Sequence, residues 1–324
     1  MKRIAAFQTV LFVCILVGAL CIPTHGYTQS KFPNRPINLY LPFPPGGFID
    51  LGARPLANSV SKILGQPVVC INKPGASATL APTMLKSMEP DGYNLSLALV
   101  TVFYLPSQEN VSYDPMKDFT YISRIMGTQF GICVRSDSQW KTLKELVDYA
   151  RAHPRGIKYS TAAPRGTQRL AMEDMALKEG VKWEVVPFLG GVEAVSALLG
   201  GHVHATVQGP EWIPHVESGE LRLLATLGEQ RSKRFSKVPC FKELGYTSHA
   251  SPIGIIGPAK MPKEIVTVLD EAFKKALSDP DVQKSFEQLD APILYMNNVE
   301  YTNWAKEMYA YSTDLIKKIG LAKK

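Results

Sequence analysis

The residues best suited to chemistry form a loop rich in proline and glycine, Pro42–Asp50 (PFPPGGFID). Its prolines restrict the turn, while Gly46 and Gly47 let backbone N–H groups approach a ligand with no side chain between them. A helical face follows, formed by Ala53, Leu56, Val60 and Ile63. The free N–H groups and the dipole of a helix N-terminus favour negative charge, so the loop predicts a carboxylate or phosphate site. Taken alone, the same pattern is also typical of a simple tight turn.

Other patterns that carry chemistry are weak or missing. His202 and His204 lie two residues apart, which in a strand places both on one face and could begin a metal site. No third or fourth ligand is evident, and an exposed strand end is the alternative. The sequence contains no G-x-S-x-G, G-x-G-x-x-G or G-x-x-x-x-G-K-[ST] motif. We therefore expect no metal, no cofactor and no enzyme activity.

Apolar runs that favour β-strands alternate with helical periodicity along most of the chain. Many of the runs are continuously apolar, as expected of strands covered on both faces in parallel sheets. One helix has Thr142 and Glu145 at capping-box spacing, another begins after Pro262, and a third follows Asn297. The pattern predicts an α/β fold of mostly parallel sheets flanked by helices, with ligands beyond the carboxyl ends of strands. The expected strands are Ile37–Phe43, Pro67–Ile71, Tyr93–Val100, Phe130–Val134, Ile157–Thr161, Trp183–Phe188, Val203–Gln208, Leu221–Leu227 and Ile253–Gly257.

The first segment, Met1–Gly26, has the features of an export signal. Lys2 and Arg3 precede the apolar run Val10–Ile22, whose 13 residues are fewer than the roughly 20 of a membrane span. We expect a free periplasmic protein, cleaved near Gly26. The formal net charge of +7 is scattered along the chain. A nucleic-acid binder usually concentrates its basic residues on one surface, so we expect no nucleic-acid partner.

Several motifs, in one order and at characteristic separations, resemble a known family. They are Lys31–Asp50 (KFPNRPINLYLPFPPGGFID), Gly65–Ala76 (GQPVVCINKPGA), Pro90–Leu95 (PDGYNL), Val186–Ala205 (VPFLGGVEAVSALLGGHVHA), Gly219–Leu227 (GELRLLATL) and Gly257–Pro262 (GPAKMP). Together they resemble the extracytoplasmic solute receptors of tripartite tricarboxylate transporters, also called Bug-type proteins. The resemblance covers essentially the whole chain after the signal segment.

The resemblance implies a two-lobed, hinged periplasmic binding protein of the Venus flytrap type. Such receptors bind a carboxylate in the cleft between the lobes, often through backbone and water contacts. Carried over by position, the implied ligand residues are Phe43, Gly46, Gly47 and Asp50 in a first loop, and Ala76, Ser77 and Ala78 in a second. From the opposite lobe they are Thr161, Ala162, Ala163, Thr167, Gly190 and Gly191.

The sequence departs from the family pattern at several of these positions. Phe48 stands where a small polar residue is common, and it either narrows the pocket or adds an apolar contact. Gly75–Ala78 replaces a GAGG sequence, so Ser77 adds a hydroxyl while extra methyl groups restrict close backbone approach. Arg165 either pairs with a distal carboxylate of the ligand or points away as an exposed loop residue. Asp50 is either a helix cap or a water-mediated contact, and Pro55 either starts the first helix or kinks it.

We expect two α/β lobes joined by two crossovers, near residues 125 and 222. Residues 27–125 and about 222–250 are assigned to lobe 1, and 126–221 and about 251–324 to lobe 2. The expected function is capture of a small organic anion, a di- or tricarboxylate or an aromatic acid, by a monomer. The expected partners are the membrane subunits of a tripartite tricarboxylate transporter. A ligand sensor that partners a signalling protein and a periplasmic hydrolase are the alternatives.

Overall fold

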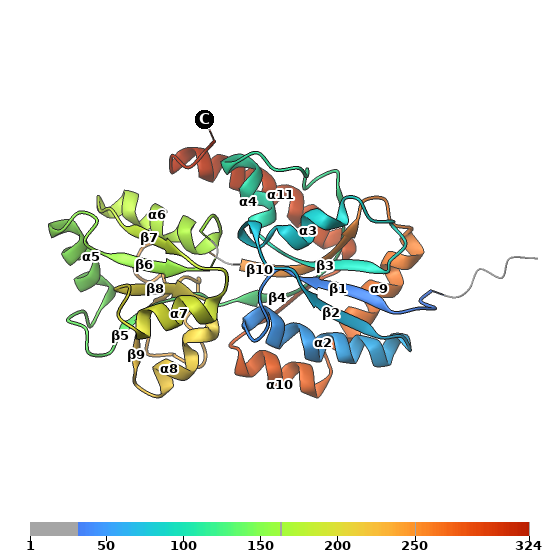
Figure 1. The fold of residues 1–324 in the computed structure, drawn as a ribbon, viewed down its shortest axis with the longest axis horizontal. Coiled ribbons are helices and arrows are strands. Elements are labelled where there is room, and N and C mark those ends of the chain that lie inside the picture. The colour runs from blue at the N-terminus through green and yellow to red at the C-terminus, as the bar shows by residue number, and fades with distance from the viewer. Residues whose placement is uncertain (1–31, 163, 250, 324) are drawn as a thin grey trace, which may run out of the picture. The chain divides into compact units, whose positions relative to one another are not determined.

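The structure, a computed structural model, describes residues 32–162, 164–249 and 251–323. Residues Arg35–Lys324 form one compact unit, divided from Met1–Asn34. That unit contains two β-sheets flanked by helices (Figure 1), which confirms the expected α/β class. The expected signal segment, Met1–Gly26, lies outside the described residues.

The larger sheet has six strands in the order β11-β4-β10-β3-β1-β2. Strand β1 pairs in parallel with β2 and β3, whereas β10 is antiparallel to both β3 and β4, and β11 is antiparallel to β4. The strands are β1 (Ile37–Leu41), β2 (Val68–Asn72), β3 (Asn94–Leu99), β4 (Phe119–Thr128), β10 (Ser251–Pro258) and β11 (Ile293–Met296).

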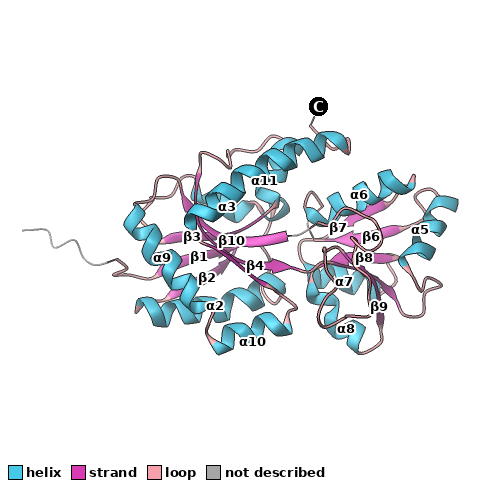
Figure 2. Ribbon diagram, turned by 180° about the vertical axis from the view of Figure 1, so that it is seen from behind, coloured by secondary structure: helices cyan, strands magenta, loops and turns pink. Residues whose placement is uncertain are grey.

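Helices cover both faces of this sheet, as Figures 1 and 2 show from opposite sides. On one face, α3 (Leu80–Leu85), α4 (Thr101–Gln108) and α11 (Asn298–Lys318) share a hydrophobic cluster with the strands. Within it, the ring centroids of Phe103 and Tyr121 lie 6.0 Å apart. On the other, α2 (Phe48–Leu64) packs against both α9 (Lys263–Ala276) and α10 (Pro280–Gln288).

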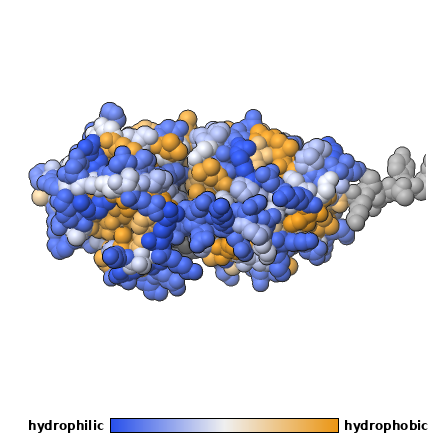
Figure 3. Space-filling model, turned by 90° about the horizontal axis from the view of Figure 1, so that it is seen from below, coloured by the Kyte–Doolittle hydropathy of each residue, from blue (hydrophilic) through white to orange (hydrophobic). Residues whose placement is uncertain are grey.

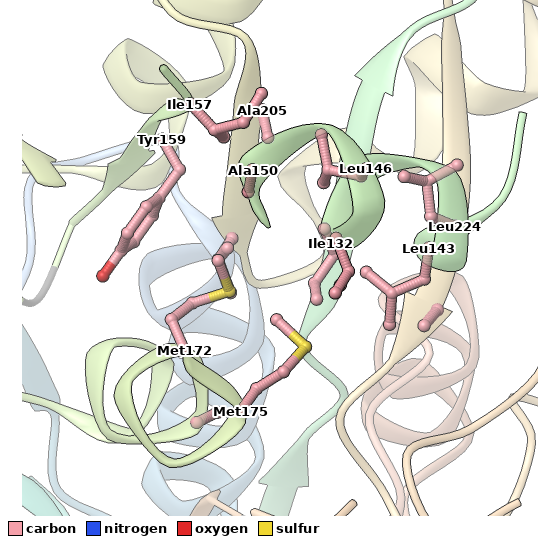
Figure 4. Packing of buried hydrophobic residues seen from close by; sticks show 14 of the residues in the cluster. Ile132, Leu143, Leu146, Ala150, Ile157, Tyr159, Met172, Met175, Ala205 and Leu224 are labelled. Carbon is pink, nitrogen blue, oxygen red and sulfur yellow. The ribbon is translucent and has the colours of Figure 1, made fainter. Parts of the chain in front are cut away.

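The smaller sheet has five strands in the order β7-β6-β8-β5-β9. Strand β5 shows why both faces are covered: Ile132 and Val134 join one hydrophobic cluster, and Cys133 between them joins another. The first cluster contains residues of α5 (Leu143–Ala152) and α6 (Thr167–Glu179), whose side chains meet those of the strands in Figure 4. The second contains residues of α7 (Gly191–Leu199) and α8 (Ile213–Glu217). The strands are β5 (Gly131–Arg135), β6 (Lys158–Thr161), β7 (Glu184–Pro187), β8 (Ala205–Gln208) and β9 (Leu221–Thr226).

Both sheets are mixed, where the sequence predicted mostly parallel ones. Only β1, β2 and β3 in one sheet, and β6, β7 and β8 in the other, pair in parallel. The antiparallel pairings all involve β4, β5, β9, β10 or β11. Strands β4 and β9 lead the chain out of their sheets, and β5 and β10 bring it into the other sheet. Each of the four runs antiparallel to its neighbours.

The two crossings lie close to where they were expected, but the segments after the second one belong to the opposite sheets. The chain passes from β4, which ends at Thr128, to β5, which begins at Gly131. It returns between the end of β9 at Thr226 and the start of β10 at Ser251. Strand β9 overlaps the expected lobe 1 segment 222–250, but it pairs with β5 of the smaller sheet. Strands β10 and β11 lie in the expected lobe 2 segment 251–324, but they join the larger sheet. An apolar run predicts a strand but does not indicate which strand it pairs with. The assignment of these segments to lobes was wrong for this reason.

Pro55 lies inside α2, which runs from Phe48 to Leu64, so the helix does not start at Pro55. Proline lacks the N–H that would bond the carbonyl four residues earlier, here that of Leu51. The Ser285 hydroxyl of α10 donates to that carbonyl oxygen at 3.2 Å. The neighbouring helix therefore supplies the missing donor.

On the face seen in Figure 3, hydrophobic residues gather in several patches separated by hydrophilic ones. Within residues 32–323, apart from 163 and 250, no helix has the length and apolar character needed to cross a membrane. In the same part of the chain, no group of three His, Cys, Asp or Glu side chains is placed to hold a metal ion.

Candidate functional site

A buried aspartate forms hydrogen bonds that hold the loop after β1 in place. Asp50, 3% exposed, accepts a hydrogen bond from the backbone N–H of Gly46 at 3.0 Å through Oδ2. Its Oδ1 lies 2.6 Å from Nη2 of Arg54 and accepts from Nδ2 of Asn72 at 2.9 Å. Burial opposes ionisation of Asp50, but the hydrogen bonds from Arg54, Gly46 and Asn72 outweigh it and lower the pKa. Asp50 thus holds the loop in place and does not line the cavity beside it.

That cavity, of about 690 Å³, lies between the loops of the two sheets. One wall comes from the larger sheet, through the loop after β1 and Leu99 at the end of β3. The opposite wall comes from segments of the smaller sheet that follow β6, β7 and β8. The lining residues beyond the loop after β1 are Leu99, Thr128, Phe130, Ala162, Gln168, Phe188, Gly190, Gly191, Val192, Glu193, Ser196, Ala197, His202, Gln208, Gly209 and Glu211. A largely apolar cleft with a few convergent polar groups is the usual form of a small-molecule site.

Three helices that begin beside this cavity start after glycine without a side-chain cap, and α9, none of whose residues lines the cavity, also starts without one. Helices α2, α6 and α7 follow Gly47, Gly166 and Gly190, and none of these starts has a side-chain cap. Gly47 and Gly190 line the cavity, and α6 contributes Gln168 from its first turn. By contrast, side-chain oxygens cap α5, α10 and α11, from Thr142, Asp279 and Asn297 respectively. A helix start without a cap leaves first-turn N–H groups available to an anion.

At α2, however, a carboxylate of the protein already accepts from one of these N–H groups. Oε1 of Glu211 lies 3.0 Å from the backbone N of Phe48. Glu211 belongs to the short 3₁₀ segment Pro210–Trp212, which follows β8 of the smaller sheet. Because Gly46 N–H also donates to Asp50, two N–H groups of the loop that were predicted to be free have protein acceptors.

The carboxylate of Glu211 is closely enclosed. Its Oε2 is buried and has no hydrogen-bond partner. A methyl group placed on Gly191 would lie 2.5 Å from Oε1, and one on Gly209 would lie 2.9 Å from Oε2. Burial raises the pKa of Glu211, and the nearby negative charge of Glu193 raises it further. The glycines therefore make room for a carboxylate that has no cation beside it.

Two further lining residues carry a buried polar atom without a partner. Gln208 is 2% exposed, and its Nε2 has no partner, while its Oε1 accepts from the N–H of Gly209 at 3.1 Å. The hydroxyl of Thr128, in a residue that is 7% exposed, also has no partner. Buried donors are normally satisfied, so these two are exceptions beside the cavity.

A second hollow, of about 520 Å³, adjoins the first and shares Phe43, Ala162, Phe188 and Glu193 with it. The predicted second loop, formed by Ala76, Ser77 and Ala78, lines this hollow. All three residues have positive φ values, of 47°, 51° and 69°. Such a backbone is strained for residues other than glycine.

The structure brings together most, but not all, of the residues implied by the resemblance. Phe43, Gly46, Gly47, Phe48, Ala162, Gly190 and Gly191 line the larger cavity, and Ala76, Ser77 and Ala78 line the second hollow. Asp50, Thr161, Arg165 and Thr167 line neither of them. Ala163 lies outside the described residues. Phe48 lines the larger cavity, which is compatible with both alternatives expected for it.

Arg165 is placed as the second of its two expected alternatives describes. Its Nε lies 2.9 Å from Oε2 of Glu109, and both side chains are substantially exposed. Its carbonyl oxygen accepts from Nε2 of Gln108 at 2.9 Å. In this structure the guanidinium of Arg165 therefore pairs with Glu109 and not with a group at the cavity.

Of the two histidines, His202 lines the cavity and His204 does not. Nδ1 of His204 instead accepts a hydrogen bond from the backbone N–H of Lys158 at 3.0 Å.

Sequence reasoning missed the polar residues that follow β8. Strand β8, which was predicted correctly, ends at Gln208, and Gly209 and Glu211 follow it. The rule that ligands lie beyond the carboxyl ends of strands, applied to β6 and β7, points equally to this loop. Thr128 and Gln168 carry no comparable signal, because each is a single polar residue within an ordinary strand or helix.

Comparisons with known proteins agree on one family. The chain is 42% identical over 308 residues to the "UPF0065 protein in gbd 5'region" of Cupriavidus necator, covering 95% of this chain and 94% of that protein. The periplasmic binding protein BugD has a similar structure, with a TM-score of 0.84 and 28% identity over 90% of this chain and 100% of that one. The structure of R. palustris Rpa4515 with adipate also has a TM-score of 0.84, with 27% identity over 90% of this chain and 99% of that one. Residues 52–321 match the family described as "Tripartite tricarboxylate transporter family receptor", and the chain therefore belongs to that family.

Proposed function

We propose that this protein is a periplasmic receptor that captures a small carboxylate in the cavity between its two sheets. It would deliver that solute to the membrane subunits of a tripartite tricarboxylate-type transporter. Members of the family and the similar solved structures are solute-binding proteins and not enzymes. The adipate in the structure of Rpa4515 supports a carboxylate as the class of ligand.

The observation that carries the proposal is the set of uncapped helix starts at the cavity. Three helices begin there at glycine, whereas three helices elsewhere have side-chain caps. Each such start offers N–H groups and the positive end of a helix dipole to an anion. The bond between Phe48 N–H and Glu211 is itself an example of a carboxylate oxygen at one of these starts.

Capture would act through closure of the two sheets around the ligand. We assign residues 35–128 and 251–323 to one lobe and 131–226 to the other, with hinges at the two crossings. A ligand that contacts both walls stabilises the shut form according to its differential affinity for it. The shut receptor, as a monomer exported by the segment Met1–Gly26, would then present its surface to the membrane subunits.

A thermal-shift screen against mono-, di-, tri- and aromatic carboxylates tests this function. A ligand at a hundred times its dissociation constant stabilises a protein by about 2.7 kcal/mol, which such a screen detects. We expect at least one acid to raise the melting temperature, with one-to-one binding and no product formed. A response to sugars or polyamines alone, with none to any acid, would contradict the proposal.

A further inference from the structure

The carboxylate of Glu211 lies between the starts of two helices. Its Oε1 is 3.0 Å from the backbone N of Phe48, the first residue of α2. A methyl group on Gly191, the first residue of α7, would lie 2.4 Å from Cδ of Glu211. Neither helix has a side-chain cap from its own N-terminal residue. Because helix starts favour negative charge, this carboxylate occupies a place that also suits the anionic group of a ligand.

Glycines leave just enough room for this carboxylate. A methyl group on Gly209 would lie 2.9 Å from Oε2, and one on Gly191 would lie 2.5 Å from Oε1. Gly47 adjoins the same oxygen, since a methyl group there would lie 3.6 Å from Oε1. Neither Gly191 nor Gly209 has a positive φ, so the backbone itself does not require glycine at these two positions. The close approach of the Glu211 carboxylate does require it.

Folding alone does not account for a charged residue at this position. Burial raises the pKa of Glu211, and no lysine or arginine lines the cavity beside it in the described part of the chain. A buried carboxylate without a cation lowers stability. Glutamine has nearly the same shape, and its side-chain oxygen would accept from Phe48 N–H without burying a charge. The charge of Glu211 therefore points to a role in binding.

The bond between Glu211 and Phe48 joins the two proposed lobes. Phe48 begins α2 beside the larger sheet, whereas Glu211 follows β8 of the smaller sheet. Opening of the lobes at the two crossings therefore separates these residues and frees Phe48 N–H. An N–H group has a single hydrogen, so it does not bond fully to Glu211 and to a ligand at the same time. Glu211 and a ligand carboxylate thus compete for one donor.

We propose that Glu211 is a tethered carboxylate that occupies the start of α2 in the ligand-free protein, and that the carboxylate of the solute displaces it when the lobes reopen. This inference rests on the proposed function, because the displacing group is the carboxylate of the captured solute. Only the fraction of molecules with a free α2 start binds the solute there, so Glu211 weakens the apparent affinity. After the solute leaves, Glu211 returns to Phe48 N–H and opposes rebinding.

Acetate tests the first half of the inference without knowledge of the natural solute. Glu211→Ala removes the tethered carboxylate and leaves its place between the helix starts open to a free one. We expect acetate to raise the melting temperature of this variant by about 2 °C or more, and to leave that of the wild type unchanged. Acetamide, which has the same shape without the charge, is the control, and sodium chloride keeps the ionic strength equal.

Affinities for the best acid of the carboxylate screen test the second half. We expect Glu211→Ala to bind that acid about tenfold or more tightly than the wild type, measured by calorimetry with the full chain. Glu193→Gln is the matched control, because it removes another negative charge from the cavity lining and leaves the bond to Phe48 in place. It should tighten binding by less than about threefold, which is the share of simple charge repulsion.

Glu211→Gln keeps the inference testable if the alanine variant does not fold. Its amide oxygen still accepts from Phe48 N–H, but a neutral group is held less strongly at a helix start than a charged one. We expect this variant to bind the acid more tightly than both the wild type and Glu193→Gln. Circular dichroism establishes that each variant is folded.

Three results would overturn the inference in distinguishable ways. If acids bind the wild type, but the Glu211 variants bind them no more tightly and acetate has no effect, Glu211 is only a distant cap of α2 and the proposed function stands. If Glu193→Gln tightens binding as much as Glu211→Ala, charge repulsion replaces competition for the donor. If acetate stabilises Glu211→Ala while no acid of the screen binds either protein, the proposed function fails and displacement by a solute fails with it.

Discussion

Two groups of three helices differ in how they begin, although α3, α4, α8 and α9 also lack a side-chain cap. Where the first turn faces away from the cavity, Thr142, Asp279 and Asn297 place a side-chain oxygen on the free N–H groups. At or beside the cavity, the starts after Gly47, Gly166 and Gly190 have no cap from their own N-terminal residue, and at α2 the carboxylate of Glu211 accepts from Phe48 N–H instead. Capping stabilises a helix, so an open start forgoes stability that the sequence obtains elsewhere. The comparison separates residues selected for folding from residues selected for binding.

Adding a cap at the cavity should have the largest effect. In Gly190→Ser, the new Cβ would displace the carboxylate of Glu193, its nearest neighbour, and would lie 3.3 Å from Cγ of Pro44. The new hydroxyl could bond the first turn of α7. We expect ligand affinity to fall by about tenfold to a hundredfold, because losing a hydrogen bond to a charged group costs about 1.5–3 kcal/mol. Calorimetry with the best acid from the screen measures this change.

The reciprocal change, Thr142→Gly, gives α5 an uncapped glycine start and serves as the control. It should leave the affinity unchanged. An affinity that is equal in Gly190→Ser and the wild type would remove the distinction between the two kinds of helix start.

Removing a cap away from the cavity should affect stability and leave binding alone. Asn297 accepts from the N–H groups of Val299 and Glu300, and the Glu300 side chain accepts from Asn297 N–H in return. We expect Asn297→Ala to lower the free energy of unfolding by about 0.5–2 kcal/mol. Urea denaturation measures the loss, and a parallel titration should give the wild-type dissociation constant. Weaker ligand binding in this variant would show that the two classes of helix start are not independent.

The smallest effect is expected at Arg165. Its ion pair with Glu109 is largely exposed, and such pairs contribute about 0–1 kcal/mol. Arg165→Ala should therefore change the dissociation constant by less than about twofold. A tenfold loss in the same titration would instead place the guanidinium against the ligand and restore the first expected role of this residue.

Local sequence patterns predicted much of the fold and part of the site. Each of the nine expected strands overlaps a strand of the structure, because apolar runs and their flanking turns are read from neighbouring residues. Gly46 and Gly47 were found for the same reason, since a glycine between a strand and a helical face is a local signal, whereas Gly190 and Gly191 came from the resemblance to the family. Strands β4 and β11 were missed: β4 carries Thr120, Ser123 and Arg124 among its apolar residues, and β11 is only 4 residues long.

The remaining features depend on contacts between distant parts of the chain. The bond between Glu211 and Phe48 joins residues 163 positions apart, and no local pattern reports it. The same holds for β9, whose apolar run fits either sheet until its pairing with β5 is known. Arg165 was assigned to the ligand from its loop, whereas its actual partner, Glu109, lies at the end of another helix.

The order of strands in the larger sheet has a consequence for synthesis on the ribosome. Strand β4 pairs only with β10 and β11, which are made after the whole of the five-stranded sheet. The smaller sheet, continuous in sequence from β5 to β9, can therefore be complete while β4 still has an open edge on each side. Since unpaired strand edges promote aggregation, the nascent chain is most vulnerable in the interval before residue 251 emerges.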